Sequence, residues 1–544
     1  MKKIFLVMPC FVMLQFFCIN CFSQYLQKEI DSILGKQFPA NQPGAAVLIA
    51  KDNNVIYDKA FGSANLELNV ALKTDNIFRI GSITKQFTAC AILQLAEQGK
   101  LSLHDSITKF IKDYPEHGVT IEHLLTHTSG INSGGGYWTP ELRKKDFMPL
   151  ELINVFKDKP MEFSPGTRFW YNNNGYVLLG YIIQVVSGMP YDKHITENIF
   201  KPLGMMHTAY DNSSTIIPER VTGYRKDDEK YINADFLSMT QPYSAGSIIS
   251  TVGDLFIWNQ ALFNYKVISK QSLEKAQTSF KLNDGTLTGY GYGWGVGNIK
   301  GSPAIKHDGA INGFSTFSVF LPNEKIFIAI FANCENLNLE ISASEIAAMV
   351  MGKPYHTNKI KLPEEKLKSY VGVYQSKTGS QKMVSYEDGR LLYFGKGGGK
   401  EEILPYGDDR FYFDNNLAII HFESRKHDSL LVVKEEDRQD TFALTNSKPN
   451  VFTPIAMPVE TLQKYLGQYK FADGFILSIF KEGNKMYGKG SGQRQVRQEI
   501  LPYDKNKFYA KNMDAQLIFK EDEAGNITGL VKVQGDESNA TKVE

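Results

Sequence analysis

The sequence predicts an α/β fold for about the first 350 residues and an all-β tail after them. Two β-prone segments, 314–321 and 326–333, are joined by the turn Pro322–Lys325, which is typical of an antiparallel hairpin. Apolar runs of helical period lie upstream of this hairpin. The tail carries one pattern of short aromatic and aliphatic runs twice, which indicates duplicated β domains.

The composition is that of an ordinary soluble globular protein with several domains. The chain has 544 residues and 42% hydrophobic content, which is enough for sizeable cores. Its 60 basic and 59 acidic residues leave a net charge of +1. This balance points neither to a nucleic-acid partner nor to an anionic membrane surface.

The first 23 residues have the three parts of a secretory signal peptide. Two lysines precede the apolar run Ile4–Phe17, and we expect cleavage after Ser23, giving a periplasmic or secreted protein. Cys18 and Cys21 leave a lipoprotein alternative open, although neither follows the small residue that lipid attachment prefers. No later run approaches 18 apolar residues, so we expect no membrane span.

The segment Ser82-Ile83-Thr84-Lys85 opens the first apolar helix. Residues at i and i+3 share a helix face with β-carbons about 5–6 Å apart, so an amine that loses its proton could activate this hydroxyl. The strand-like Phe78–Gly81 precedes it, and Ser82 would then lie at a helix N-terminus, where free N–H groups stabilise an oxyanion. Spacing alone does not exclude a capping serine and a solvated lysine.

Two further segments supply groups that such chemistry needs. A turn-rich loop, Phe163–Tyr176, delivers Tyr171 and Asn173 ahead of an apolar helix. A phenol can relay or accept a proton, and a carboxamide can donate to a substrate carbonyl and orient Lys85. His307 lies just before the β-hairpin and is expected to flank the reacting centre.

Together these segments resemble the three motifs of the serine β-lactamase and penicillin-binding-protein superfamily. The supporting phrases are similar to the class C β-lactamase branch, which includes D,D-peptidases, D-aminopeptidases and esterases. The matching segments are Ser82-x-x-Lys85, Tyr171-x-Asn173, His307-x-Gly309, Leu124–Gly130, Lys201–Met205 and Tyr290–Trp294. The resemblance implies a hydrolase domain over 24–352 with the β-lactamase-like three-layer sandwich. An antiparallel sheet from 45–61 and 314–333 would be flanked by helices, with a helical subdomain between them.

The resemblance also implies a mechanism without cofactor or metal. Ser82 Oγ attacks a carbonyl, and water hydrolyses the acyl-enzyme. By family position the oxyanion hole is formed by the backbone N–H groups of Ser82 and Ala310, Asn173 holds the acyl side chain, and His307 and Gly309 contribute to substrate binding. Lys85 and Tyr171 have reference pKa values of about 10.4 and about 10, so either must be perturbed to act as base, and the choice stays open.

The third motif departs from the Lys-Thr-Gly of many β-lactamases, because this chain has His307-Asp308-Gly309. An imidazole binds a substrate carboxylate less strongly than an ammonium, and Asp308 adds a negative charge nearby. This favours hydrolysis of D-amino-acid peptides, cell-wall fragments or small esters. A β-lactamase acting on antibiotics and a non-catalytic penicillin-binding-like sensor are the alternatives. A literal Lys377-Thr378-Gly379 in the tail is interpreted as a chance match.

The tail follows a polar linker, Gly352–Pro363, and contains two related copies. Leu367–Tyr374 matches Leu462–Tyr469, and Ile403–Tyr406 matches Ile500–Tyr503. The runs alternate with Gly, Asp and Asn turns, which predicts two small antiparallel barrels or sandwiches over 364–448 and 459–544. They resemble the lipocalin-like modules appended to some enzymes of this superfamily.

Two other features have simpler interpretations. His123 and His127 stand at i and i+4, but the glutamate of a His-Glu-x-x-His site is absent, so a packed loop is favoured over a metal site. Cys90 follows Ser82 on the same apolar helix and is expected in the core rather than in catalysis. The sequence leaves the oligomeric state open.

Overall fold

The computed structural model describes residues 24–134, 139–227, 230–355, 360–424, 429–435, 438–491 and 497–543. The signal peptide and the lipidation alternative, both within residues 1–23, lie outside the described residues. Across the described ranges, no helix combines the length and apolar character needed to span a membrane. The chain divides into two compact units between Pro354 and Tyr355, and each is described by itself.

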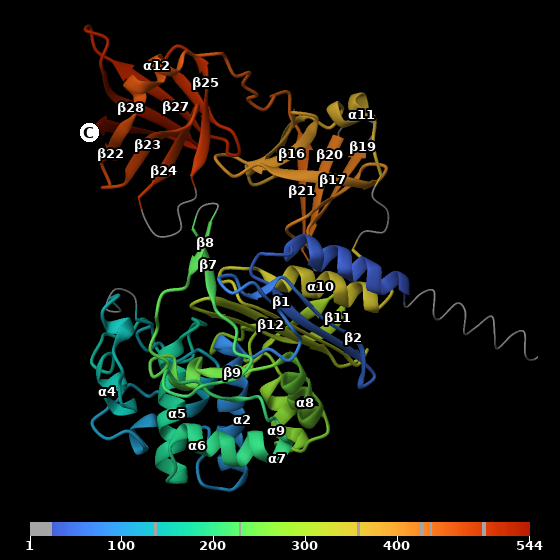
Figure 1. Ribbon diagram of the computed structural model, residues 1–544, viewed down its shortest axis with the longest axis vertical. Coiled ribbons are helices and arrows are strands. Elements are labelled where there is room, and N and C mark those ends of the chain that lie inside the picture. Colours follow the sequence, from blue (N-terminus) through green and yellow to red (C-terminus); the bar gives the residue numbers. More distant parts are fainter. Residues whose placement is uncertain are drawn as a thin grey trace, which may run out of the picture. The chain divides into compact units, whose positions relative to one another are not determined.

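The first unit is built on a six-stranded antiparallel sheet whose strands come from both ends of the unit (Figure 1). Its strands, in spatial order, are β10 (Gly295–Ile299), β11 (Ser302–Ile311), β12 (Phe314–Leu321), β13 (Ile326–Ala332), β1 (Ala45–Lys51) and β2 (Asn54–Phe61). Strand β1 joins the two ends, because Ala45 lies opposite Ala332 and Lys51 opposite Ile326. The predicted sheet is therefore confirmed.

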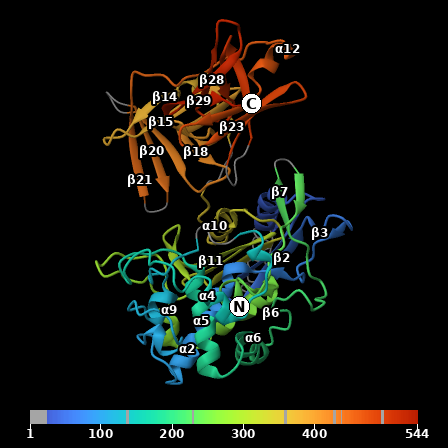
Figure 2. The ribbon, with the colours of Figure 1, turned by 90° about the vertical axis from the view of Figure 1, so that its left-hand side faces the viewer.

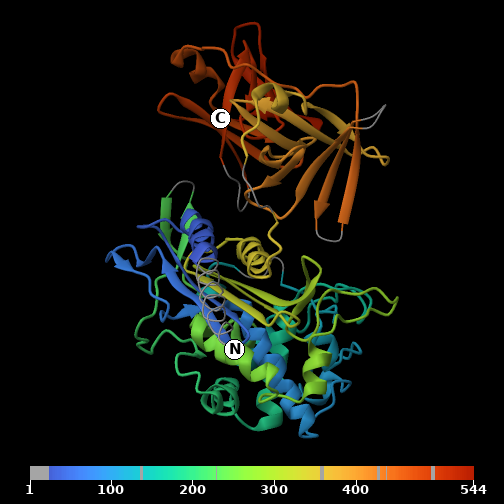
Figure 3. The same cartoon turned by 90° about the vertical axis from the view of Figure 1, so that its right-hand side faces the viewer.

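Side chains of β1 alternate between two hydrophobic cores, as the two-residue period of a strand requires. Val47 and Ile49 pack with a helix over residues 24–37 and with α10 (Leu339–Val350), which lie on the same face of the sheet (Figure 3). Ala46 and Leu48 pack on the opposite face with the helices α2 (Thr84–Glu97) and α8 (Val252–Phe263). The three-layer arrangement predicted from the family resemblance is confirmed.

A mainly helical part lies between the two groups of strands in chain order, and its helices lie on the side of the sheet opposite α10 (Figure 2). Its helices are η1 (Gly81–Ile83), η2 (Ile107–Lys109), α3 (Ile121–Leu125), η3 (Leu142–Lys144), α4 (Pro149–Asn154), α5 (Asn173–Ser187), α6 (Tyr191–Ile195), η4 (Thr196–Phe200), α7 (Lys201–Leu203), η5 (Tyr243–Ala245) and α9 (Lys270–Ala276). Its small sheets are β3 (Ser63–Asn65) with β4 (Val70–Ala71), β5 (Phe78–Arg79) with β9 (Ile248–Ser250) and β6 (Ala209–Tyr210), and β7 (Tyr224–Asp227) with β8 (Lys230–Asn233). Cys90 is fully buried in α2.

The second unit consists of two closed antiparallel barrels of eight consecutive strands each. The short helix α11 (Glu364–Lys368) precedes the first barrel. The short helix α12 (Val459–Leu462), which continues into η6 (Gln463–Tyr465), precedes the second. The first contains β14 (Gly372–Gln375), β15 (Gln381–Glu387), β16 (Arg390–Gly395), β17 (Glu401–Gly407), β18 (Arg410–Phe413), β19 (Ile419–Ser424), β20 (Ser429–Glu435) and β21 (Arg438–Leu444). The second contains β22 (Gly467–Phe471), β23 (Ile476–Glu482), β24 (Lys485–Gly490), β25 (Gln498–Asp504), β26 (Lys507–Ala510), β27 (Gln516–Glu521), β28 (Ile527–Gln534) and β29 (Asp536–Lys542).

The duplication seen in the sequence is visible in the structure as one hydrogen bond that occurs at equivalent positions of the two barrels. In the first barrel the Tyr374 hydroxyl donates to the backbone carbonyl of Tyr370 at 2.8 Å. In the second barrel Tyr469 donates to Tyr465 at 2.7 Å in the same way. Both tyrosine pairs are buried, so each hydroxyl satisfies a carbonyl inside an apolar core. The predicted pair of β domains is confirmed as a pair of barrels.

A truncated chain ending at Pro354 should fold and keep the chemistry of the first unit. This unit has its own cores and closes with α10 packed on the sheet. We expect one cooperative thermal transition and stoichiometric labelling of Ser82 by a serine-directed fluorophosphonate, with the full-length chain as control. Insoluble or unlabelled truncated protein would contradict this prediction.

Candidate active site

The nucleophile candidate and its partner lie at the junction of η1 and α2. Ser82 lies in η1, a single 3-10 turn that the left-handed Gly81 (φ 52°) introduces, and α2 begins two residues later. Lys85 Nζ donates to Ser82 Oγ at 3.0 Å. It also donates to Asn173 Oδ1 at 2.8 Å and to the Ala245 carbonyl at 2.9 Å. The predicted hydroxyl–amine pair is therefore brought together, with a 3-10 turn in place of the expected α-helical start.

Lys85 is fully buried, and this changes its protonation. Desolvation lowers the pKa of its ammonium to about 7, although the nearby Asp308 carboxylate favours the charged form. Its three hydrogen-bond partners are neutral, so none of them holds the proton as a carboxylate would. A large fraction of Lys85 is therefore neutral at neutral pH, with a lone pair available next to Ser82.

Tyr171 lies beside the same pair, on the loop before α5. Lys85 Nζ lies 4.8 Å from the centre of its ring. Although 38% of the residue is exposed, desolvation of the phenol raises its pKa, which a hydrogen bond with Ser82 opposes. Tyr171 is thus a protonated phenol near neutral pH. Asn173 is the first residue of α5, whose N-cap Asn172 accepts from the backbone N–H of Asn174 at 2.8 Å.

His307 lies on β11 and is 4% exposed. One ring nitrogen lies 2.8 Å from the Tyr290 hydroxyl and the other 2.6 Å from the backbone oxygen of Asp308. Burial lowers the pKa of the imidazole to about 4, while the Asp308 carboxylate favours protonation. His307 is therefore uncharged near neutral pH. It cannot form the charged contact with a substrate carboxylate that the sequence suggested.

Strand β11 passes close to η1 because position 309 is glycine. A β-carbon on Gly309 would lie 2.1 Å from the Ile80 carbonyl oxygen and 2.2 Å from Thr316 Oγ1. A β-carbon on Gly81 would lie 3.0 Å from the amide nitrogen of Ala310. The backbone at Ala310 is thus next to the turn that carries Ser82, where the predicted oxyanion hole requires it.

His127 lies beside Tyr171 and Tyr290 in the candidate site. The sequence analysis did not predict this position. It is 1% exposed and has a left-handed backbone (φ 58°), an uncommon conformation for a residue with a side chain. Its Nδ1 accepts from the Asn172 N–H at 3.0 Å, so the ring proton is on Nε2. The ring centre lies 4.2 Å from that of Tyr171 and 4.8 Å from that of Tyr290. His123, in contrast, accepts from Thr120 in a capping box of α3.

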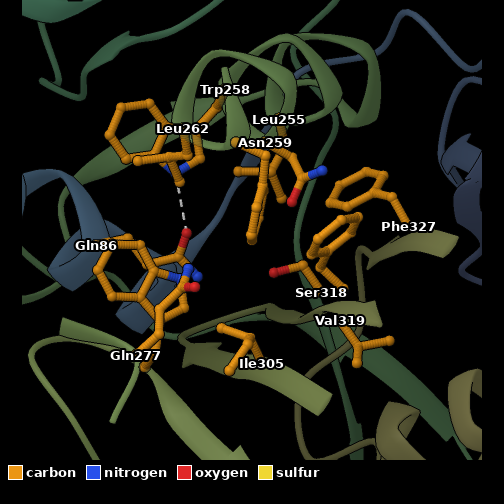
Figure 4. A pocket seen from close by; sticks show the side chains of 13 residues that line it. Gln86, Leu255, Trp258, Asn259, Leu262, Gln277, Ile305, Ser318, Val319 and Phe327 are labelled. Carbon is orange, nitrogen blue, oxygen red and sulfur yellow. Dashed lines mark hydrogen bonds between the residues drawn. The ribbon is translucent and has the colours of Figure 1, made fainter. Parts of the chain in front are cut away.

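Two cavities differ in what they can hold. One of about 20 Å³ lies between α8 and the sheet, lined by residues such as Trp258, Gln277 and Ser318 (Figure 4). It has room for about one water molecule. The second, of about 240 Å³, opens beside Ser82 and Asn173. Its other lining residues are Arg143, Asn174, Val177, Leu237, Gln241, Pro242, Ala245, Gly246, Ala310, Ile311 and Asn312.

The literal Lys377-Thr378-Gly379 belongs to the second unit, between β14 and β15. It lies outside the compact unit that contains Ser82. The sequence analysis did not predict a place in the site for Arg143 or for the Ala245 carbonyl. Both reach the site through tertiary contacts from segments that carry no local motif. For His127 a signal existed, since the phrase Leu124–Gly130 contains it.

Comparisons with known proteins show which family this chain resembles in sequence and fold. A family model described as Beta-lactamase matches residues 34–346. "Penicillin-binding protein 4*" of Bacillus subtilis (strain 168) is 30% identical over 418 residues, covering 72% of this chain and 92% of that protein. The octameric penicillin-binding protein homologue from Pyrococcus abyssi superposes with a TM-score of 0.55 at 26% identity, covering 87% of this chain and 99% of its own. D-amino acid amidase from Ochrobactrum anthropi SV3 shares the fold, with a TM-score of 0.54 at 22% identity, covering 60% of this chain and 99% of its own.

Proposed function

The chain belongs to the Beta-lactamase family, within the superfamily of serine β-lactamases and penicillin-binding proteins, and on this premise we propose a mechanism centred on Ser82. In this proposal the protein is an exported serine hydrolase that cleaves D-amino-acid peptides, cell-wall fragments or small esters. Export rests on the lysine-led apolar leader that ends at Ser23.

The observation that carries the proposal is the neutral amine of Lys85, 3.0 Å from Ser82 Oγ. Lys85 takes the hydroxyl proton as Ser82 Oγ bonds to the substrate carbonyl carbon, and the carbonyl oxygen becomes an oxyanion. The backbone N–H groups of Ser82 and Ala310 stabilise that charge. Collapse of the adduct expels the leaving group, which takes a proton, and water then attacks the acyl-enzyme in the same manner.

Tyr171 acts in this scheme as a proton relay rather than as the base. Its phenol has a raised pKa, hydrogen-bonds with Ser82 and lies against Lys85. It can therefore pass a proton between the ammonium and the leaving group. Asn173 orients Lys85 and offers its amide nitrogen to the acyl side chain of the substrate. His307 acts as a neutral residue that positions Tyr290.

The third motif supports esters and peptides whose leaving group carries no carboxylate over β-lactam antibiotics. Asp308 has 79% of its side chain exposed and puts a carboxylate beside the reacting groups. The neutral His307 supplies no compensating positive charge. An anionic leaving part, such as the carboxylate-bearing ring of a penicillin, would be repelled there.

The test is a panel of substrates with one purified sample. We expect turnover of a 4-nitrophenyl ester and of N-acetyl-D-alanine 4-nitroanilide, with the L-alanine compound as the matched control for stereochemistry. A chromogenic cephalosporin should show a kcat/KM at least about tenfold below that of the ester, since it carries the disfavoured carboxylate. Covalent labelling of Ser82 is measured as the increase in the intact mass of the protein.

Two results would contradict the proposal. A cephalosporin hydrolysed faster than every ester and amide would make the protein a β-lactamase. Stoichiometric labelling of Ser82 without turnover of any substrate would make it a sensor that is acylated and stays acylated.

A further inference from the structure

The cavity beside Ser82 has one formally charged residue among the described residues that line it, Arg143. The other lining side chains are neutral amides, the Ser82 hydroxyl and apolar groups. Asp308 does not line this cavity. The two charges therefore act on different parts of a substrate: the positive one inside the cavity next to Asn173, and the negative one on the strand beside His307.

Among the residues that the structure describes, the Arg143 guanidinium has no carboxylate partner. Within the described ranges no salt bridge involves it, although Glu141 and Asp146 lie close in sequence. Asp146 instead accepts from the Ser238 hydroxyl at 2.5 Å. The neighbouring Lys144 and Lys145 add to the positive potential of this segment. An exposed guanidinium that lines a cavity without an internal counter-ion is available to an anion from outside.

The turn that carries Arg143 is fixed to the cavity wall. Gln241, itself a lining residue and only 8% exposed, donates through Nε2 to the carbonyl oxygens of Leu142 and Lys145. The Ser238 N–H donates to the Arg143 carbonyl at 3.0 Å. The backbone of Arg143 is thus held from a loop about a hundred residues away in the chain, which reduces the ordering needed when a ligand binds.

We propose that Arg143 is the anchor for an anionic group on the acyl part of the substrate. This inference rests on the proposed function, since it assigns the substrate class of the same site. The cavity contains Asn173, which holds the acyl side chain, so the bound anion belongs to the acyl group and not to the leaving group. Its volume of about 240 Å³ is below the 300–1,000 Å³ of pockets for drug-sized ligands. A short chain that ends in a carboxylate fits this space.

The test compares two substrates that differ by one charge. N-glutaryl-D-alanine 4-nitrophenyl ester carries a free carboxylate, and its glutaryl methyl ester does not. We expect wild-type protein to show a KM about tenfold lower for the carboxylate, as for a hydrogen bond between charged groups. Arg143→Gln should bring the two KM values together, Arg143→Glu should reverse their order, and Arg143→Lys should keep part of the preference.

Lys144→Gln is the matched control, because it removes the same charge from the adjacent residue, which does not line the cavity. It should keep the preference of the wild type. Raising the salt concentration from about 0.05 to about 0.5 M should weaken the preference in the wild type and leave Arg143→Gln unchanged.

Binding separates this inference from the proposed function. Dissociation constants of the two corresponding 4-nitroanilides are measured by calorimetry on Ser82→Ala protein, which cannot be acylated. If the carboxylate compound binds more tightly and Arg143→Gln abolishes this difference, the result supports Arg143 as the anchor. This conclusion holds even if neither ester is turned over. The absence of turnover would overturn only the hydrolase proposal. Equal dissociation constants and equal KM values in the wild type would overturn the anchor and leave the hydrolase proposal standing.

Discussion

Ser82→Ala is expected to lower kcat for the ester substrate by about 10⁵–10⁶-fold, the loss that accompanies removal of a serine nucleophile. Alanine has no oxygen to form the acyl bond, and no second hydroxyl donor is hydrogen-bonded to Lys85 within the described residues. The lysine keeps its contacts with Asn173 and Ala245. The measurement is the initial rate of ester hydrolysis, together with intact mass after fluorophosphonate treatment.

The fold of this variant should stay intact. The substitution removes the hydrogen bonds of the Ser82 hydroxyl with Lys85 and Tyr171, each worth about 1 kcal/mol, so the melting temperature should shift by less than about 4 °C. Ser213→Ala, an exposed serine in another loop, is the matched control and should behave as wild type. Activity of Ser82→Ala within tenfold of wild type would exclude the mechanism.

Lys85→Met is expected to lower kcat/KM by about 10²–10⁴-fold, the contribution of a positioned base. In the wild type, kcat/KM should rise as the pH increases through about 7, because the pKa of Lys85 is lowered to about 7 and only its neutral form accepts a proton. His307, with a pKa of about 4, and Tyr171, with a raised pKa, stay neutral between about pH 6 and 9. The rise should therefore be absent in Lys85→Met.

Two further variants decide between Lys85 and Tyr171 as the base. Lys85→Arg keeps a positive charge that cannot be lost, so it should be as inactive as Lys85→Met. Tyr171→Phe should also lose activity but keep the rise near pH 7. A Tyr171→Phe protein whose kcat/KM no longer depends on pH, combined with an active Lys85→Arg, would move the base to Tyr171.

Local spacing was sufficient to predict the pair Ser82–Lys85 and the loop that carries Tyr171. The i, i+3 relation is a property of a helical turn and needs no tertiary information. The left-handed Gly81 explains why a 3-10 turn replaces the expected start of an α-helix. Strand β10 was not predicted, because Gly295, Gly297 and Asn298, which are residue types depleted in strands, interrupt its two β-branched residues.

The protonation states could not be predicted from sequence, because they depend on burial by distant segments. The partner of Lys85 at the Ala245 carbonyl is 160 residues away, and the ring of Tyr171 is covered by His127 from an earlier loop. The sequence analysis included His127 in the phrase Leu124–Gly130 without a role, and favoured a packed loop over a metal site for His123 and His127. The loop is packed as expected, and the ring of His127 packs against Tyr171 of the second motif.

The close contact at Gly309 has a consequence for how this site can evolve. Along β11, alternate residues face opposite sides, so His307 and Gly309 are buried whereas Asp308 and Ala310 are exposed. A side chain at 309 would displace the strand from Ile80, and with it the amide of Ala310. Position 308 carries no such steric penalty. A single substitution at position 308 can therefore reverse or remove the charge beside the nucleophile while the close backbone contact at Gly309 is kept.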